Sequence, residues 1–504
     1  MDFFTVLLSL LFPFLWAFLH ILISNKISRS SKHLPPGPSP LPVIGNILDL
    51  GNNPHQSLTN LSKRYGPIMT LKLGTITTIV ISTVAMAKEV LHTNDLVFSS
   101  RTVPDSVSSL GHDRVSVVWI SASAKWRSLR RACSTELFSP KRLDSTQSLR
   151  QKKMQELLDV VEGRCKKGEA VDIGKAAFTT ALNSISNTFF SMDLAYYSSD
   201  RAQEFKDTIW GIMEEAGRPN IVDYFPVFRG LDPQGVRARM DYYFGKLLKF
   251  FDGIVEEKLR LRSLKAESEI TNDVMDSFLN LLINSQLTRE EVLHLFLDLF
   301  AAGIDTTSST VEWAMAELIH NPEKLVKTKQ ELQHVIGKNG KLEESRISEL
   351  PYLNAVVKET LRLHPPVPFL IPRKSDNDVQ VGGFVVPKNS QILVNVWAMG
   401  RDSRVWKEPD SFEPERFMEG HDHHKVDFKG RDFEFIPFGA GRRICPGLPL
   451  ANRSVHLMLV ALLNHFDWIL EDDLKPKEMD MSDKFGLTLK KSQPLRAVPT
   501  KLRT

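Results

Sequence analysis

The chain has 504 residues, 42% of them hydrophobic, which is enough to bury a large core. Its 64 basic and 60 acidic residues leave a net charge of +4, too little to indicate nucleic-acid binding. The three cysteines, Cys133, Cys165 and Cys445, are too few for a disulfide framework in a chain of this length. The composition therefore favours a globular protein that works in a reducing compartment.

An almost unbroken apolar segment runs from Phe3 to Ile23. As a helix, this segment would reach about 31 Å, enough to cross the hydrocarbon core of a membrane. A cleaved signal peptide is the alternative, but such a peptide has a shorter apolar region that ends at small residues. Lys26, Arg29 and Lys32 follow the segment. The positive-inside rule then predicts a permanent transmembrane anchor over residues 1–24, with the rest of the chain in the cytosol.

A basic and proline-rich stretch follows over residues 25–45, and it ends in Leu34-Pro-Pro-Gly-Pro-Ser-Pro-Leu-Pro-Val-Ile-Gly45. Repeated prolines cannot continue a helix and favour stiff extended structure. The stretch is predicted to be a semi-rigid hinge between the anchor and a globular body, and a proline-rich ligand for a partner domain is the alternative. Because no long low-complexity stretch or repeat follows, residues 46–504 are predicted to form one domain.

A long amphipathic helix is predicted from about Arg289 to Asn321. Thr288 and Glu291 have the spacing of a capping box, and Pro322 follows the end of the helix. Apolar residues recur between these signals at helical spacing, which favours one face packed against a core.

The centre of that helix is the sequence Ala301-Ala-Gly-Ile-Asp-Thr-Thr307. Its three small residues would let a flat ligand approach the helix backbone. The hydroxyl of Thr306 can bond to the carbonyl four residues back, and Asp305 is placed to deliver protons through water. The structural alternative is a helix crossing built on small residues, with Asp305 solvated.

A glycine-rich loop, Phe438-Gly-Ala-Gly-Arg-Arg-Ile-Cys-Pro-Gly447, holds Cys445 just before an apolar helical run from Leu448 to about Leu463. A thiolate at a helix N-terminus is stabilised by unpaired backbone N–H groups and by the helix dipole. Glycines in the loop let the backbone fold close over the sulfur. This environment suits an anionic sulfur that binds iron from one side, whereas an ordinary buried thiol is the alternative.

These two segments resemble motifs of the cytochrome P-450 family. The cysteine loop resembles its haem-binding signature F-x-x-G-x-R-x-C-x-G, and the helix centre resembles its oxygen-activating A-G-x-D/E-T-T segment. Glu359-Thr-Leu-Arg362 resembles the E-x-x-R element, and Phe412-Glu-Pro-Glu-Arg-Phe417 resembles the segment that adds Arg416 to a buried charge network. The motifs follow the family order along nearly the whole chain.

The resemblance implies a mainly α-helical fold with small β-sheets, which is the cytochrome P-450 fold. It also implies haem b, with Cys445 as the axial thiolate ligand of the iron, and Asp305 and Thr306 as catalytic residues. The haem propionates need cationic partners. Trp126 and Arg130, in a W-x-x-x-R element, together with Arg443 and Arg373, are the residues that the resemblance assigns to them. For Arg373 a surface charge after a strand is the alternative.

The activity that the resemblance implies is monooxygenation. More narrowly, the chain resembles plant microsomal members, in the group that includes geraniol 8-hydroxylase and related terpenoid hydroxylases. A terpenoid substrate is therefore expected. The enzyme is expected at the endoplasmic reticulum membrane, with its catalytic domain in the cytosol. Since the chain has no nucleotide-binding loop, electrons from NADPH would come through a separate reductase.

Three alternative functions stay open from the sequence. The substrate can be a phenolic or tyrosine-derived compound instead of a terpenoid. A haem-thiolate isomerase or dehydratase would use the same cysteine without consuming NADPH, although Asp305 and Thr306 argue against it. A haem-based sensor or binding protein is the third.

The resemblance also predicts where substrate and reductase bind. Phe296, Phe300, Phe369 and Leu370 are expected to make the substrate pocket apolar. The pocket segments are expected to be Val103–Ile120, Phe205–Gly217, Phe296–Ile304, Val367–Ile371 and Phe485–Thr488. A basic face for an acidic reductase is expected from Lys125, Arg127, Arg131, Lys429, Arg431 and Arg442.

Overall fold

The computed structural model describes residues 33–197, 200–264, 274–338, 340–341 and 343–502, together with the isolated positions Phe12 and Trp16. Apart from those two positions, the anchor predicted over residues 1–24 lies outside these ranges. Within the described ranges, no helix combines the length and the apolar character that a membrane crossing needs.

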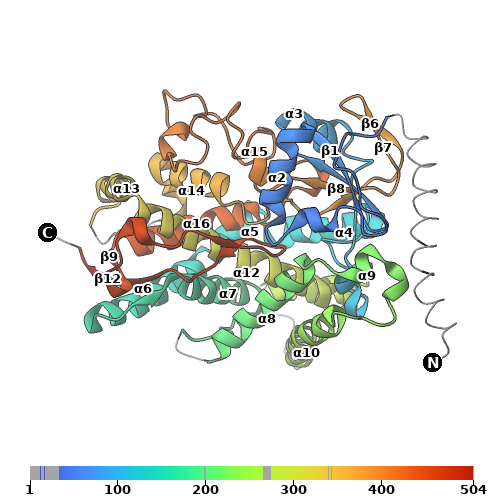
Figure 1. Cartoon of the computed structure of the whole chain (residues 1–504). Coiled ribbons are helices and arrows are strands. Elements are labelled where there is room, and N and C mark those ends of the chain that lie inside the picture. The colour runs from blue at the N-terminus through green and yellow to red at the C-terminus, as the bar shows by residue number, and fades with distance from the viewer. Residues whose placement is uncertain are drawn as a thin grey trace, which may run out of the picture.

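Helices make up most of the described chain, as the resemblance implied (Figure 1). The longer helices are α2 (Pro54–Tyr65), α4 (Ala124–Ala132), α6 (Gln147–Lys167), α7 (Ile173–Phe190), α8 (Asp200–Gly217), α10 (Val236–Ser263), α11 (Val274–Ile283), α12 (Arg289–His320), α13 (Pro322–Val335), α14 (Pro351–Leu363) and α16 (Leu448–Leu463). Shorter ones include α3 (Val84–Lys88), α5 (Pro140–Ser145), α9 (Ile221–Tyr224) and α15 (Val396–Met399).

The β-structure is small, which confirms the expected fold class. The largest sheet has the order β1-β2-β8-β5-β3, built from β1 (Ile68–Leu73), β2 (Ile76–Ile81), β8 (Gln391–Val394), β5 (Arg373–Lys374) and β3 (Ser100–Arg101). A second sheet joins β4 (Val171–Asp172), β12 (Arg496–Lys501) and β9 (Phe466–Leu470). Two hairpins pair β6 (Val379–Val381) with β7 (Phe384–Val386) and β10 (Asp483–Lys484) with β11 (Lys490–Lys491).

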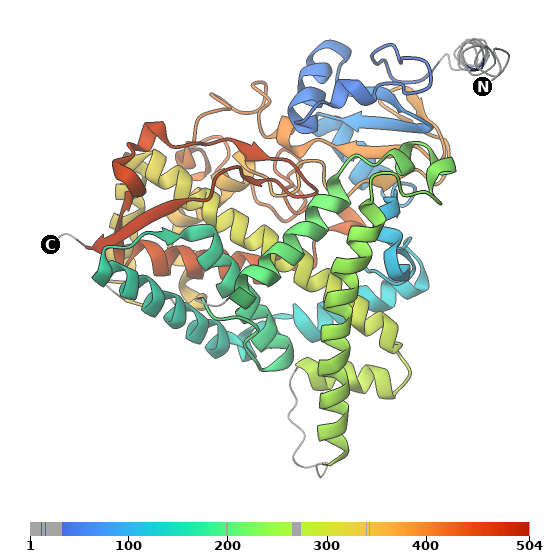
Figure 2. The ribbon, with the colours of Figure 1, turned by 60° about the horizontal axis from the view of Figure 1, so that its bottom comes forward.

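Helix α12 runs through the middle of the molecule, between α7 and α16 and beneath the crossing helices α8 and α10 (Figures 1 and 2). The capping box that the sequence predicts is present, because the Thr288 side chain accepts from the Glu291 backbone and the Glu291 side chain accepts from the Thr288 backbone. The helix ends at His320, one residue before the predicted end. The predicted helix after the cysteine loop is also confirmed, as α16.

The end of the proline-rich stretch packs on the large sheet. The carbonyl of Pro36 accepts a hydrogen bond of 2.8 Å from the Thr70 backbone N–H, and Gly45 forms a bridge with Leu73. A Cβ on Gly37 would come within 1.9 Å of the Thr70 carbonyl oxygen, so this close approach requires glycine. The second half of the stretch is therefore seated on the globular body.

Candidate active site

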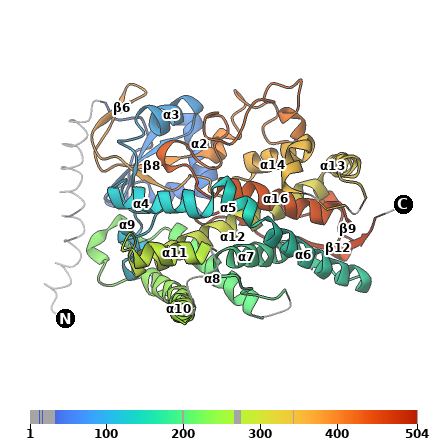
Figure 3. The same cartoon turned by 180° about the vertical axis from the view of Figure 1, so that it is seen from behind.

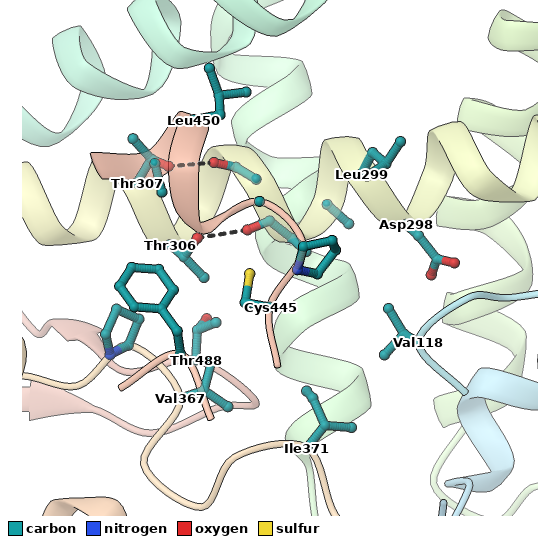
Figure 4. A pocket seen from close by; sticks show the side chains of 18 of the residues that line it. Val118, Asp298, Leu299, Thr306, Thr307, Val367, Ile371, Cys445, Leu450 and Thr488 are labelled. Atoms are coloured by element: carbon teal, nitrogen blue, oxygen red, sulfur yellow. Dashed lines mark hydrogen bonds between the residues drawn. The ribbon is translucent and has the colours of Figure 1, made fainter. Parts of the chain in front are cut away.

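An internal cavity lies between α12 and the loop that carries Cys445 (Figure 4). All five predicted pocket segments contribute lining residues to this cavity, at Val107, Met213, Ala302, Val367 and Thr488. The sequence therefore identified the segments that meet around the cysteine, although they come from distant parts of the chain.

The three phenylalanines and Leu370 that were expected to line this cavity are not among its lining residues. Phe296 and Phe300 pack instead against Phe189, Phe190 and Phe251, with ring centroids 5.5 Å apart for Phe190–Phe300 and 5.0 Å for Phe251–Phe300. Asp298 and Ala302 each follow one of these phenylalanines by two positions and do line the cavity. Two positions turn the helix by about 200°, so the phenylalanines lie on nearly the opposite face of α12. Phe369 and Leu370 are packed in the clusters beside the large sheet. The expectation for these four residues was wrong.

The loop before Cys445 is shaped by two glycines in the left-handed region. Gly439 has φ 71° and Gly441 has φ 67°. A Cβ on Gly441 would come within 2.3 Å of the Leu91 carbonyl oxygen, so no side chain fits there. The Cys445 backbone N–H then donates to the Phe438 carbonyl at 3.0 Å, and α16 begins three residues after the cysteine.

This geometry surrounds the Cys445 sulfur with hydrogen-bond donors. Burial raises the pKa of the Cys445 thiol, whereas backbone N–H groups of Gly447 and Leu448 and the charge of Arg130 lower it. The donors belong to the first turn of α16, where the helix leaves N–H groups unpaired. A bound metal ion would outweigh the burial and favour the thiolate.

Across the cavity, α12 presents small and hydroxylic side chains. Ala302 is exposed to the cavity although it lies in the middle of the molecule, and Thr306 follows one turn later on the same face. The Thr306 hydroxyl donates a hydrogen bond of 2.7 Å to the Ala302 carbonyl (Figure 4). This is the local hydrogen bond that the sequence predicted. It leaves the hydroxyl oxygen able to accept a hydrogen bond from a water molecule.

Asp305 lies behind this face and is 8% exposed. It is not among the residues that line the cavity, but the Thr488 hydroxyl, which belongs to a lining residue, donates to its carboxylate at 2.6 Å. Burial raises the pKa of the Asp305 carboxyl, and the Thr488 hydrogen bond and the charges of Lys490 and Lys206 lower it. The carboxyl is thus connected to the cavity through Thr488, a contact that no sequence motif marks.

Three arginines and a tryptophan gather at one end of the cavity. Trp126, Arg130 and Arg443 line it, and the Arg443 guanidinium lies 4.5 Å from the centre of the Trp126 ring. Arg130 donates to the Ile444 carbonyl at 2.8 Å and so fastens α4 to the cysteine loop. Arg101 lines the cavity beside them and was not predicted, because it belongs to no motif.

None of these three arginines pairs with a carboxylate in the part of the chain that the structure describes, although the charge of Asp95 favours the charged form of Arg443. Among the described residues, the hydrogen bonds of Arg101, Arg130 and Arg443 go to backbone carbonyls, including Val118 at 3.1 Å and Ser99 at 2.8 Å. Burial and the other arginines lower the pKa of Arg443 to about 10 and that of Arg101 well below its usual value. Buried cations that repel one another indicate a site for an anionic group.

Arg373 lies one strand away from this group. Its strand β5 pairs with β3, so that Arg373 is directly opposite Arg101. Its guanidinium contacts the Asp95 carboxylate at 3.3 Å and the Ala440 carbonyl at 3.0 Å, and it is not among the cavity-lining residues. It is buried, which excludes the alternative of a surface charge.

The residues around the cavity fit haem. Cys445 supplies a sulfur donor on one side, and Ala302 leaves the opposite side open. Arg101, Arg130 and Arg443 supply the cationic partners that two propionates need. The donor set and the uncompensated charge thus match a thiolate-ligated haem.

The predicted charge network is present and lies apart from the cavity. Arg362 forms two hydrogen bonds to the Glu359 carboxylate, at 2.7 and 2.8 Å, and Arg416 donates to it at 3.0 Å. Glu359 and Arg362 are both almost completely buried. The network joins α14 to the turn Pro414–Phe417, which gives it a structural role.

Comparison with known proteins identifies the family. The cytochrome P-450 family model matches residues 35–496. The chain is 54% identical over 504 residues, 100% of both chains, to geraniol 8-hydroxylase of Catharanthus roseus. It is 52% identical over 480 residues, 95% of this chain and 96% of the other, to geraniol 8-hydroxylase of Swertia mussotii. It is 45% identical over 503 residues, 99% of both chains, to geranylhydroquinone 3''-hydroxylase of Arnebia euchroma.

The chain belongs to the cytochrome P-450 family. It is a haem-dependent monooxygenase, whose iron is held by a cysteine thiolate and whose electrons come from NADPH through a reductase.

Proposed function

We propose that this monooxygenase hydroxylates a small hydrophobic plant metabolite of the terpenoid class, a monoterpenoid alcohol such as geraniol or a diterpenoid. The observation that carries the proposal is the cavity, in which Cys445 and Thr306 face a space lined by apolar side chains such as Val118, Val367 and Ile371 (Figure 4). An apolar lining favours a substrate that is itself mostly hydrocarbon. Two of the relatives are geraniol 8-hydroxylases, which supports the terpenoid class.

We assign the haem-holding roles to particular residues. Cys445 would ligate the iron, and Trp126, Arg130 and Arg443 would hold the propionates together with Arg101. Arg373 would support this group from behind, because it donates to the Ala440 carbonyl in the cysteine loop. When bound, haem b activates molecular oxygen with two electrons and supplies one oxygen atom to a C–H bond. The N–H groups of the first turn of α16 would keep the sulfur charged, because they donate to it from inside the protein.

Thr306 and Asp305 are assigned to proton handling. The Thr306 hydroxyl donates a hydrogen bond to the Ala302 carbonyl and presents its oxygen to the cavity, so it can orient a water beside the reacting oxygen. Asp305 holds a proton more readily than an exposed carboxyl, since burial raises its pKa. The Thr488 hydroxyl, bonded to Asp305 at 2.6 Å, connects that carboxyl with the cavity.

A reductase would dock on the face that α4 covers (Figure 3). One side of α4 contacts the site through Trp126 and Arg130, while Arg127 and Arg131 point to solvent. Lys429, Arg431 and Arg442, in the loops before Cys445, are also exposed. Clustered positive charge attracts an acidic partner and raises the rate of encounter. Lys125 pairs with Glu291 at 2.9 Å, Lys429 with Asp427 at 2.7 Å and Arg442 with Asp95 at 3.5 Å. We therefore expect Arg127, Arg131 and Arg431 to contribute most.

The enzyme would be held at the endoplasmic reticulum membrane by residues 1–24 as a single-pass anchor, with the catalytic domain in the cytosol. The apolar segment Phe3–Ile23 and the basic residues that follow it support this placement. Deleting residues 1–24 should release most of the protein from microsomes while haem stays bound. Unchanged resistance to carbonate extraction would contradict the anchor.

Product analysis with two variants tests the function. Microsomes with reductase and NADPH are offered terpenoid alcohols, olefins, phenolic diterpenes and tyrosine, and products are identified by mass spectrometry. Thr306→Ala should keep haem and substrate binding but lose product per NADPH, by up to the roughly 10²–10⁴-fold that general acid help provides, while peroxide release rises. Cys445→Ala should lose haem and the reduced carbon monoxide band that gives the family its name. Products from tyrosine alone would contradict the terpenoid assignment.

A further inference from the structure

A buried polar cluster lies at the N-terminal end of the part of α12 that lines the cavity. The Asp298 carboxylate accepts hydrogen bonds from the Ser116 hydroxyl at 2.8 Å and from the Val117 backbone N–H at 2.9 Å. His112 Nε2 lies 3.1 Å from the same carboxylate, and His112 Nδ1 lies 2.8 Å from His294 Nδ1. The cluster joins α12 to the segment after the turn Asp105–Arg114, which forms the opposite wall of the cavity.

The hydrogen-bond partners of the two histidines define their tautomers. Burial and the charge of His112 lower the pKa of His294 to about 4, so His294 is neutral near pH 7. The Asp298 carboxylate can only accept, so His112 donates to it from Nε2, and the Nδ1 atoms of His112 and His294 share the remaining hydrogen bond. The whole chain of hydrogen bonds is then satisfied, and it ends on a carboxylate.

Asp298 can still accept one more hydrogen bond. A carboxylate offers about four acceptor positions, and three protein donors use them here: Ser116, Val117 and His112. Asp298 also lines the cavity, whereas Val118 near it and Val367 and Ile371 elsewhere on the lining are apolar (Figure 4). A ligand that brings a single O–H donor to an otherwise apolar surface matches this arrangement.

Asp298 and Thr306 project from the same side of α12, toward the loops that carry Cys445, Val367 and Ile371 (Figure 4). With Ala302, they occupy positions i, i+4 and i+8, which share one helix face. Eight residues of helix separate Asp298 from Thr306 by about 12 Å along the axis. The cavity therefore has an acceptor at one end and the reacting residues at the other.

We propose that Asp298 accepts a hydrogen bond from the hydroxyl group of an alcohol substrate and thereby determines which carbon is oxidised. The inference rests on the proposed function and adds to it the substrate group that is recognised. An extended chain advances by roughly 1.25 Å per bond, so eight carbons in a row span roughly 8–9 Å. With a hydrogen bond of about 2.8 Å, the far carbon comes level with Thr306 when the hydroxyl is at Asp298. An acyclic terpenoid alcohol is then oxidised at the end opposite its hydroxyl.

The charges around the cavity favour an alcohol over an amine. A carboxylate can bind an ammonium group as well as a hydroxyl. However, Arg101, Arg130 and Arg443 line the same cavity and would repel an ammonium group. A neutral alcohol would meet no such repulsion.

Matched ligands test the inference on the haem-loaded full-length protein without any change to the fold. Binding of geraniol, geranyl methyl ether and geranylamine is measured by equilibrium dialysis, and the geraniol product is identified. Geraniol should bind roughly tenfold or more tightly than the ether, since the ether has no proton to donate to a charged acceptor. Equal binding of alcohol and ether would overturn the inference but leave the proposed function intact. Absence of binding by any terpenoid would overturn the proposed function. Tighter binding of geranylamine than of geraniol would overturn the choice of an alcohol.

Asp298→Asn gives the second readout. Its amide oxygen can still accept from the Val117 N–H, which places the amide NH₂ at the other carboxylate position, where His112 Nε2 accepts from it as the other tautomer. Because NH₂ donates to an alcohol and to an ether alike, the preference for geraniol should fall to within about twofold. Oxidation should also spread to other carbons. Ser116→Ala is the control, because it removes a donor to Asp298 and keeps the carboxylate. An equal loss of preference in both variants would show that anchoring of the loop is responsible, and would overturn the inference.

Discussion

Two groups of buried arginines in this molecule differ in how their charge is balanced. Arg362 and Arg416 share the Glu359 carboxylate, at distances of 2.7 to 3.0 Å. Arg101 and Arg443 lie against the cavity and donate to backbone carbonyls instead. Both groups are buried, so both carry the cost of removing a guanidinium from water.

The difference shows which group needs a ligand. The Glu359 group has a carboxylate that repays much of the desolvation, so the chain alone can hold it. The cavity group is held by backbone dipoles and pairs with no carboxylate among the described residues, although the charge of Asp95 acts on Arg443. Burial and the neighbouring arginines lower the pKa of Arg101 and Arg443. Such an arrangement becomes favourable when an anion binds, as the haem propionates do. Charge balance within the chain therefore distinguishes a structural network from a cofactor site of the same residue type.

The largest effect is expected from Glu359→Gln. It removes the one carboxylate that Arg362 and Arg416 share and leaves two buried cations unpaired. The free energy of unfolding should fall by about 3–5 kcal/mol, in protein with haem and in protein made under haem limitation. Urea unfolding measures this free energy. Glu323→Gln, at an exposed site, is the control and should leave the free energy of unfolding unchanged. A loss confined to the haem-loaded protein would mean that the two groups are not distinct.

Arg443→Met should have opposite consequences in the two states. In the haem-free protein it removes a buried, uncompensated charge, so stability in urea should stay equal or rise. In the loaded protein it removes a charged donor to the propionates, which weakens haem binding by roughly 10- to 100-fold. Transfer of haem to an acceptor apoprotein measures that change. If Arg443→Met destabilised the haem-free protein as strongly as Glu359→Gln, the comparison would fail.

The sequence predicted one group better than the other, for a physical reason. Glu359 and Arg362 share one helix turn and Cys445 lies in one loop, so their geometry is local. Arg416 comes from a segment 57 residues after Glu359, and only the family resemblance assigned it to the network. Helix α12 was also predictable, because its capping box and its apolar period are local features. Arg101 has no such pattern, since it reaches the cavity through strand β3 pairing with β5, which comes from a part of the chain far away in sequence.

The pocket shows the same limit in another form. The sequence placed the right segments at the cavity but chose the wrong faces, because Phe296 and Phe300 are as apolar as any lining residue. Their packing against Phe189 and Phe251 is decided by where α7 and α10 lie. Asp298 was missed because its partners come from a segment about 180 residues earlier in the chain. Which helix face meets a cavity depends on tertiary packing, whereas the presence of the helix does not.

Arg373→Gln should give an intermediate result and so sharpen the comparison. This arginine has a carboxylate partner, Asp95 at 3.3 Å, and also donates to Ala440 in the cysteine loop. Its loss should cost about 1–3 kcal/mol of unfolding free energy, because Asp95 loses a charged hydrogen bond. Haem transfer should change less than for Arg443→Met, since Arg373 does not line the cavity. A larger effect on haem than that of Arg443→Met would place Arg373 in direct contact with the propionates.

Substituting an exposed arginine next to the site should change neither the stability of the protein nor its haem binding. Arg131 is the best example. It lies one residue after Arg130 on α4, but its side chain faces solvent. Arg131→Glu should therefore leave urea unfolding and haem transfer unchanged, because an exposed charge pays little desolvation.

The same variant should raise the KM for the reductase by a factor of about 3–10 at low ionic strength, since it reverses a charge on the expected docking face. Salt near 0.5 M should shrink that difference, because the screening length then falls well below 10 Å. Lys338→Glu, an exposed site after α13 and far from α4 (Figure 3), is the charge-matched control. Equal effects of the two variants would show a response to net charge rather than to this face. A salt-independent loss in Arg131→Glu would instead point to a local contact with the reductase.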